Sequence, residues 1–170
     1  MILIVGPIGS GKTLLLKRLQ NRNLKIESYC DIPSTVSTVG TNIVFIKSNT
    51  KTIVAQEVGG SMTDIWNQYY SDCNSIIYVI DSSNLSKIGD SCIGLFQMVS
   101  DPNVKNRKPI LIVLNKSDVY CSSDKQEVRY FLMIDQLIDS LPNQKIQVLE
   151  SSSVTGMGLD SIYDWIQSNN

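Results

Sequence analysis

Six stretches of the chain are apolar at almost every position, and each of them is short. They span residues 2–5, 43–46, 52–55, 75–80, 110–114 and 146–149. Short, continuously apolar runs are typical of β-strands that are buried on both faces. Elsewhere, apolar residues recur every three or four positions, which is the spacing of one helix face. This spacing predicts helices after residue 13 and over residues 65–70, 88–99, 128–141 and 159–166.

The alternation of buried strands with amphipathic helices predicts an α/β protein of three layers. Such a pattern is typical of a mostly parallel sheet with helices on both faces. The polar residues 47–51 join two strands closely, which predicts a hairpin and one antiparallel strand at the edge of a six-stranded sheet. A chain of 170 residues fits one domain over residues 1–170, and it shows no internal repeat or linker. Ligands of such sheets bind at the carboxyl ends of the strands.

The residues after the first strand form the motif of a P-loop NTPase. Its eight positions are Gly6, Pro7, Ile8, Gly9, Ser10, Gly11, Lys12 and Thr13. The glycines let successive backbone N–H groups point at phosphate oxygens, and the following helix adds the positive end of its dipole. Lys12 would reach the β- and γ-phosphates, and the Thr13 hydroxyl would hold Mg²⁺. A connection that binds nothing is disfavoured, because the flanking strand and helix are both predicted.

A second motif, Asn115-Lys116-Ser117-Asp118, follows the strand predicted at residues 110–114 and so lies on the same rim. The carboxylate of Asp118 would accept hydrogen bonds from N1–H and the exocyclic N2–H of guanine, which adenine does not offer. A site built to pair such groups rejects the analogue that lacks them by roughly 10⁴-fold or more. The stem of Lys116 would cover one face of the base, and Asn115 would tie neighbouring loops together. A solvated charged turn is the alternative interpretation.

Three further stretches extend the predicted site. Glu57 ends the strand beside the P-loop strand and would support Mg²⁺, while the Gly60 N–H would bond a γ-phosphate. Thr38 lies in the polar loop of residues 21–41, and its hydroxyl would complete the Mg²⁺ shell. A loop of that length is usually functional or mobile. After the last strand, Ser152 and Ser153 would border the base, with the Ser153 N–H facing a base carbonyl. Each of these stretches, taken alone, is as often an ordinary turn.

Composition excludes several other chemistries. The chain has no histidine, which removes Ser-His and Cys-His hydrolase schemes. A net charge of −1 provides no basic field to gather nucleic acid, so no nucleic-acid partner is expected. The four cysteines form no C-x-x-C pair, which indicates reduced thiols and a cytoplasmic protein. The chain also lacks a membrane-length apolar run, a signal peptide and a lipidation motif, so no intrinsic membrane anchor is expected.

Taken in their order along the chain, the five stretches resemble the five nucleotide-binding motifs of small Ras-like GTPases. Thr38-Val39-Gly40 followed by Asn42, and Val58-Gly59-Gly60 followed by Trp66 and Tyr69-Tyr70, are similar to the ADP-ribosylation factor family in particular. The resemblance spans essentially the whole chain. It implies a small GTPase G domain that binds GTP or GDP with Mg²⁺ and recruits effector proteins in the GTP state.

The same resemblance assigns Lys12, Thr38, Gly60 and position 61 to the hydrolysis step. The family usually has Gln at position 61 to orient the attacking water, and Ser61 is too short to do so. It usually has Asp at position 57, and Glu57 is one methylene longer, which would crowd the water through which this acid supports Mg²⁺. We therefore expect slow or partner-dependent hydrolysis.

The resemblance also implies partners. It suggests an exchange factor, a GTPase-activating protein, a monomeric state and a role in membrane traffic or ciliary transport. Two of the three aromatic positions that family members present to effectors are Thr41 and Gln56 here, and only Tyr69 is kept. The family's amphipathic N-terminal helix would precede the first strand, where this sequence begins. Partner choice is therefore expected to differ from that of better-known members.

Two other functions stay open at this level. One is a pseudo-GTPase, an interaction module that holds GTP without hydrolysing it. The other is a small-molecule or nucleotide kinase, which shares the P-loop but would need an arginine-bearing lid. Sparse arginine and the motif Asn115-Lys116-Ser117-Asp118 argue against the kinase.

Overall fold

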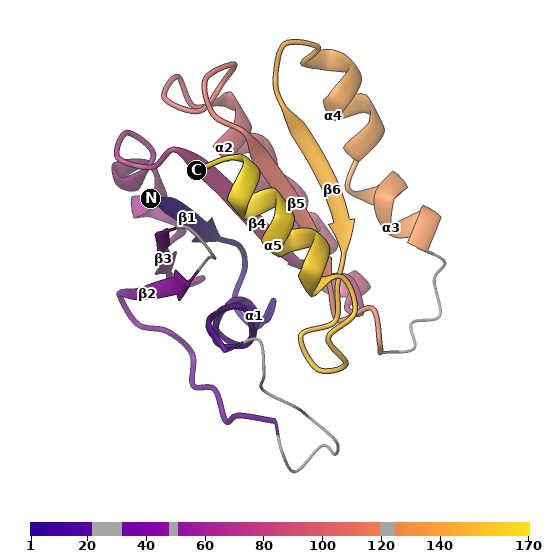
Figure 1. Ribbon diagram of the computed structural model, residues 1–170. Coiled ribbons are helices and arrows are strands. Elements are labelled where there is room, and N and C mark those ends of the chain that lie inside the picture. The colour runs from indigo at the N-terminus through magenta and orange to yellow at the C-terminus, as the bar shows by residue number, and fades with distance from the viewer. Residues whose placement is uncertain (22–31, 48–50, 120–124) are drawn as a thin grey trace.

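The computed structural model describes residues 1–21, 32–47, 51–119 and 125–170 (Figure 1). The strands are β1 Ile2–Val5, β2 Thr41–Lys47, β3 Thr52–Val58, β4 Ser75–Asp81, β5 Ile110–Asn115 and β6 Ile146–Glu150. The α-helices are α1 Lys12–Gln20, α2 Ile88–Ser100, α3 Lys125–Phe131, α4 Ile134–Ser140 and α5 Leu159–Ser168. Short 3₁₀ helices span Thr63–Tyr69 and Leu85–Lys87. Part of the polar loop of residues 21–41, the tip of the predicted hairpin, Cys30 and Cys121 lie outside the described residues.

The six strands form one sheet in the order β2-β3-β1-β4-β5-β6. β2 is an edge strand and pairs antiparallel with β3, whereas all other neighbours are parallel. The predicted α/β fold, with its mostly parallel six-stranded sheet and one antiparallel edge strand, is confirmed. The parallel register places Ile4 of β1 opposite Glu57 of β3 and Asp81 of β4 opposite Asn115 of β5. The predicted functional residues Glu57 and Asn115 therefore lie at the same rim of the sheet as the turn that follows β1.

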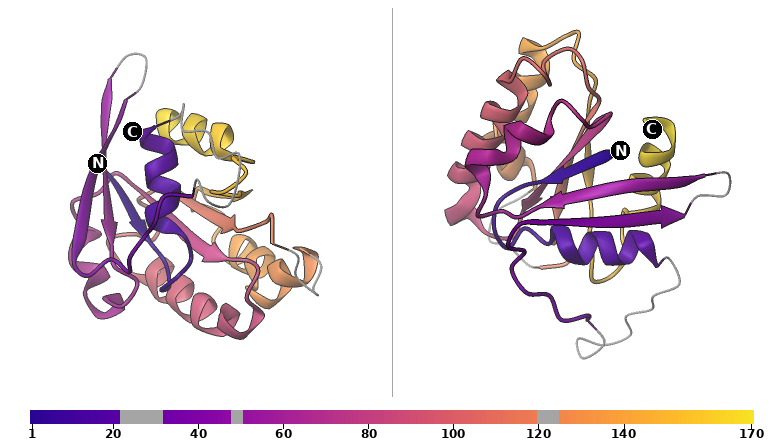
Figure 2. Two further views of the ribbon diagram at one scale, coloured as in Figure 1. Left: turned by 90° about the horizontal axis from the view of Figure 1, so that it is seen from below. Right: turned by 90° about the vertical axis from the view of Figure 1, so that its left-hand side faces the viewer.

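Helices cover both faces of the sheet (Figure 2). On one face α1 and α5 pack over alternate residues of β1, including Ile2 and Ile4. On the other face α2, α3, α4 and the 3₁₀ helix Thr63–Tyr69 pack over the remaining set, including Leu3 and Val5. Successive strand residues point to opposite faces, so a strand covered on both sides has every side chain buried. This is why the central strands have no polar face in the sequence.

The helix predicted over residues 128–141 is wrong as a single element. The structure has two helices, α3 and α4, with Met133 between them at a φ of 53°. Leu132 and Ile134 are both fully buried. Side chains two positions apart lie on nearly opposite sides of one continuous helix, so burying both requires the break at Met133. The apolar spacing on either side is helical, which explains why the sequence pattern hides the break.

No helix in the described parts of the chain combines the length and the apolar character that a membrane span requires.

Candidate nucleotide-binding site

The glycine-rich turn between β1 and α1 requires glycine at two close contacts. Gly6 has a φ of +144°, and a Cβ there would lie 2.1 Å from the carbonyl oxygen of Val79 in β4. Gly11 has a φ of +91°, and a Cβ there would meet the Asn115 side-chain amide nitrogen at 2.3 Å. Helix α1 begins directly after this turn without a side-chain N-cap or an acidic residue in its first turn. Its first N–H groups are therefore available to an anionic ligand.

Lys12 is buried beneath this turn. Its ammonium donates hydrogen bonds to the carbonyl oxygens of Gly6 at 2.7 Å and Pro7 at 2.9 Å. Burial lowers the pKa of Lys12 to about 8, and the nearby charge of Glu57 opposes part of this shift. The loop thus holds a cation in a desolvated position, where the arrival of phosphate charge would stabilise the protonated form.

Three oxygen-bearing side chains from separate elements meet beside Lys12. The Thr13 hydroxyl donates to Glu57 Oε1 at 2.6 Å, and the Thr38 hydroxyl lies 3.1 Å from that of Thr13 and 3.2 Å from Glu57 Oε1. Glu57 is 1% exposed, and its Oε2 has no hydrogen-bond partner among the described residues. A buried carboxylate oxygen without a donor, beside two hydroxyls, fits a hard divalent cation such as Mg²⁺.

A cavity of about 290 Å³ joins these parts. Its walls come from the P-loop, from the segment that carries Thr38, from the end of β3 and from Lys116. The lining residues are Ile8, Gly9, Gly11, Lys12, Thr13, Leu14, Thr35, Val36, Ser37, Thr38, Glu57, Gly60, Ser61 and Lys116. Residues that are far apart in the sequence and were predicted to act on phosphate and Mg²⁺ therefore line one space.

Asn115, at the end of β5, links the P-loop to the loop after β6. Its amide donates to the Ser10 carbonyl at 2.8 Å, and its Oδ1 accepts from the Ser151 hydroxyl at 3.1 Å. Oδ1 also accepts from the Ser153 N–H at 3.2 Å and the Ser153 hydroxyl at 3.1 Å. The Ser152 N–H is likewise engaged, with the Met157 carbonyl at 3.0 Å. The Ser153 N–H, which was predicted to face a base carbonyl, thus has a partner within the protein in this structure.

The two charged residues of the second motif have different surroundings. Lys116 forms an ion pair with Asp81 Oδ2 at 2.7 Å. Asp118 has a buried Oδ1 with no hydrogen-bond partner among the described residues. A buried carboxylate oxygen left unpaired costs free energy, and N–H donors from a bound base would remove that cost.

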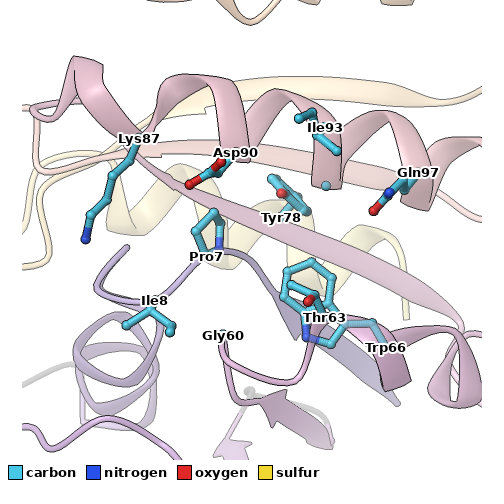
Figure 3. Close-up of a pocket in the computed structure, with 11 residues that line it drawn as sticks. Pro7, Ile8, Gly60, Thr63, Trp66, Tyr78, Lys87, Asp90, Ile93 and Gln97 are labelled. Atoms are coloured by element: carbon cyan, nitrogen blue, oxygen red, sulfur yellow. The ribbon is translucent and has the colours of Figure 1, made fainter.

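Gly60 rests directly on the P-loop. A Cβ at Gly60 would lie 2.5 Å from the Ile8 nitrogen and 2.6 Å from the Pro7 carbonyl carbon, so only glycine permits this approach. On its far side lies a second cavity of about 400 Å³, between the 3₁₀ helix Thr63–Tyr69 and α2 (Figure 3). The two cavities share Ile8 and Gly60, and Trp66 and Tyr78 line the second one. A displacement of Gly60 would therefore change both spaces.

The predicted motifs include neither Met62 nor Asp81, two residues that the structure connects to the site. Met62 Sδ accepts a hydrogen bond from the Gly40 N–H at 3.0 Å, and the Gly59 N–H donates to the Gly40 carbonyl at 2.9 Å. These bonds join the segment of Thr38 to the segment after β3. Asp81 is the second residue. The sequence signal that could have pointed to Asp81 is its position: it is a carboxylate at the end of a central strand, and the next strand along the chain leads to Asn115.

The family model of the ADP-ribosylation factor family matches residues 1–170. The chain is 34% identical over 171 residues to human ADP-ribosylation factor-like protein 16, covering 99% of this chain and 85% of the relative. It is 32% identical over 170 residues to ADP-ribosylation factor-like protein 1 of Drosophila melanogaster, covering 98% and 87%.

Solved structures show the same fold. The Arl6 BBS3 small GTPase of Trypanosoma brucei, with the bound nucleotide analogue GppNp, matches with a TM-score of 0.81 at 19% identity, covering 98% of this chain and 94% of that chain. The structure of the mammalian SRP receptor matches with a TM-score of 0.80 at 19% identity, covering 99% of each chain. The resemblance found in the sequence motifs is confirmed by the family model and the curated relatives, and the chain belongs to the ADP-ribosylation factor family.

Proposed function

We propose that this protein is a guanine-nucleotide-controlled switch that binds GTP or GDP with Mg²⁺ and recruits effector proteins in the GTP state. The observation that carries the proposal is the convergence of Lys12, Thr13, Thr38 and Glu57 on one cavity that Lys116 of the base motif also lines. Membership of the ADP-ribosylation factor family supports GTP binding. The unpaired Asp118 oxygen supports the choice of guanine, because N1–H and N2–H are the donors that it lacks.

Each of these residues has a distinct task in binding. The P-loop N–H groups and the Lys12 ammonium hold the phosphates, for which Lys12 must exchange its bonds to the Gly6 and Pro7 carbonyls for phosphate oxygens. Thr13, Thr38 and Glu57 would hold Mg²⁺, which neutralises phosphate charge when it is bound. Glu57 contacts both hydroxyls directly. These direct contacts are in keeping with the expectation that the extra methylene of Glu57 leaves less room for a water between its carboxylate and Mg²⁺.

The switching step rests on two connected segments. Thr38 is one of the residues that would hold Mg²⁺ when a γ-phosphate is bound, and the N–H of Gly60 would bond the γ-phosphate itself. The bonds from Gly40 to Gly59 and Met62 join these segments, so a change at one is transmitted to the other. Loss of the γ-phosphate would release both, which is the order-to-disorder change used by GTPase switches. A shift from 1:99 to 99:1 requires about 5.5 kcal/mol of differential binding.

The experiment that tests this proposal is hydrogen exchange of the protein loaded with GDP or with a non-hydrolysable GTP analogue. We expect the GTP analogue to increase protection in residues 32–41 and 59–70, while α5 stays unchanged. Equal protection of both segments in the two states would contradict a switch. Effectors, an exchange factor and an activating protein are part of the proposal, and each should distinguish the two nucleotide states.

Trp66 should report the nucleotide state through its fluorescence. Its indole N–H donates to the Gly59 carbonyl at 3.2 Å, and its ring lines the cavity beyond Gly60 (Figure 3). The other tryptophan, Trp165, packs in the core on the opposite face of the sheet. We expect exchange of GDP for a GTP analogue to change the emission, and Trp66→Phe to abolish the change while Trp165→Phe keeps it. A change that persists in Trp66→Phe would place the moving segment elsewhere.

Hydrolysis by the protein alone should be very slow. Ser61 lines the nucleotide cavity but lacks the length to orient a water at the γ-phosphate. We expect Ser61→Gln to raise the single-turnover rate of GTP conversion, provided that water positioning is the only defect. Ser61→Met, similar in length but without the amide, is the matched control and should not raise it. A wild-type rate equal to that of ordinary family members would refute the proposed role of Ser61.

The comparisons lend no support to a pseudo-GTPase that holds GTP permanently. Measured nucleotide exchange separates the two functions, because a switch must release GDP and take up GTP, either alone or with an exchange factor. Retention of one nucleotide under all such conditions would favour the permanent ligand.

A further inference from the structure

The ion pair between Asp81 and Lys116 lies at the base end of the cavity. Lys116 Nζ and Asp81 Oδ2 are 2.7 Å apart, and the side chains are 14% exposed for Asp81 and 36% exposed for Lys116. Asp81 ends β4, and the parallel register sets it opposite Asn115, the residue before Lys116. The carboxylate therefore approaches Lys116 from the neighbouring strand of a rigid sheet rather than from a loop.

The carboxylate of Asp81 is itself held in place. Its Oδ1 accepts hydrogen bonds from the Ser83 N–H at 3.0 Å and the Ser83 hydroxyl at 2.6 Å, which leaves Oδ2 for Lys116. The next residue, Ser82, binds the Asn115 carbonyl through both its N–H at 3.0 Å and its hydroxyl at 2.7 Å. The end of β4 thus fixes the main chain of Asn115 and the ammonium of Lys116 together.

Lys116 adopts a conformation that needs such support. Its φ is +64°, a region that side-chain-bearing residues occupy at a cost in free energy and only where the surrounding structure imposes it. A free lysine side chain also has several flexible torsions, and ordering them upon ligand binding reduces affinity. An ammonium that is anchored beforehand leaves the aliphatic stem ready to act as a wall of the base site.

We propose that Asp81 is a positioning residue for guanine-nucleotide binding, which acts by anchoring the Lys116 ammonium so that the Lys116 stem is in place before the base arrives. Asp81 makes no contact with the nucleotide in this proposal. Its contribution is pre-organisation at the base end, and it is independent of the phosphate and Mg²⁺ contacts made by Lys12 and Thr13. The inference rests on the proposed function of guanine-nucleotide binding.

The test measures release of the fluorescent probe N-methylanthraniloyl-GDP from Asp81→Asn. Asparagine keeps the shape and the acceptor oxygen for Ser83 but removes the charge that holds Lys116. We expect release to be about three- to tenfold faster than from the wild type, the scale of ordering one flexible side chain. The ratio should be the same with Mg²⁺ and with EDTA, because the change lies at the base end. Asp135→Asn, which breaks the exposed ion pair with Arg129, is the matched control and should release at the wild-type rate.

A double-mutant cycle separates positioning from a general structural role. Lys116→Met keeps an apolar stem but removes the ammonium, so Asp81→Asn should have no additional effect in that background. Asp81→Glu, which keeps the charge, should recover part of the loss. Release from Asp81→Asn at the wild-type rate would overturn the inference while guanine binding stands. So would a double variant in which the effects of Asp81→Asn and Lys116→Met on the release rate simply multiply. If the wild-type protein itself fails to bind the probe, the proposed function fails and this inference fails with it.

Discussion

Replacement of Asp118 by Asn should lower the affinity for GDP and GTP by roughly 10³- to 10⁴-fold. The buried Oδ1 of Asp118 has no donor among the described residues, and in the proposed function guanine N1–H and N2–H would be its partners. An asparagine at this position turns one acceptor into an N–H donor, which opposes the N2–H of guanine. Equilibrium titration of the nucleotide-free variant would measure the loss.

Xanthine nucleotides provide the positive arm of this experiment. Xanthine has a carbonyl where guanine has the exocyclic amine, so it offers an acceptor to the new amide and keeps N1–H for the remaining oxygen. We expect Asp118→Asn to bind xanthosine diphosphate more tightly than GDP, whereas the control Asp135→Asn keeps the wild-type preference. Unchanged GDP affinity in Asp118→Asn would remove this residue from the base site.

Replacement of Lys12 by Met should weaken binding of both GDP and ADP by about 100-fold or more, because charged hydrogen bonds to phosphate are lost. The preference for guanine over adenine should not change, since Lys12 lies at the phosphate end. Lys17→Met is the matched control, because the Lys17 ammonium on the same helix donates to the Ser34 carbonyl at 3.0 Å at an exposed position. Wild-type affinity in Lys12→Met would contradict the phosphate-binding role of the loop.

The same variant tests the buried cation in the nucleotide-free protein. The pKa of Lys12 is lowered from 10.5 to about 8, so between these pH values the unfolded chain holds one more proton than the folded protein. The free energy of unfolding therefore rises with pH across this window, by up to about 3 kcal/mol from this group. Urea denaturation at about pH 7.5 and about pH 9.5 should show this contribution in the wild type and not in Lys12→Met.

The titration of two cysteine thiols changes stability with pH in the opposite direction to Lys12, but it does not obscure that comparison. Burial raises the pKa of the Cys73 and Cys92 thiols, so their contribution to stability declines as the pH rises above the ordinary thiol range. Both proteins contain these cysteines, and the effect cancels in the difference between them. An identical pH dependence in wild type and Lys12→Met would mean that Lys12 is not buried as a desolvated cation.

The sequence pattern predicts the fold because the strands are covered on both faces. Continuous apolar runs such as residues 75–80 have one structural interpretation when amphipathic helices separate them. The hairpin of β2 and β3 also follows from local spacing. The break at Met133 does not follow, because helical apolar spacing continues on both sides and only the burial of Leu132 and Ile134 together reveals it.

Some features of the candidate site could likewise be predicted from the sequence, and others could not. The P-loop and the Asn115–Asp118 motif are contiguous in sequence, so their residue types and their position after strands suffice to predict them as site residues. Contacts made across the fold are different. The bond from Gly40 to Met62 Sδ and the ion pair of Asp81 with Lys116 depend on the conformation of two loops and on strand register. Neither residue type nor spacing specifies such contacts in a single sequence.

The most direct measurement of the central claim is calorimetric titration of the nucleotide-free protein with GDP, GTP, ADP and ATP in the presence of Mg²⁺. We predict that GDP and GTP bind at one site per chain and that the adenine nucleotides bind more weakly by roughly 10³-fold or more. Equal affinity for the two bases, or no binding of any of the four nucleotides, would contradict the assignment of this cavity to guanine nucleotides.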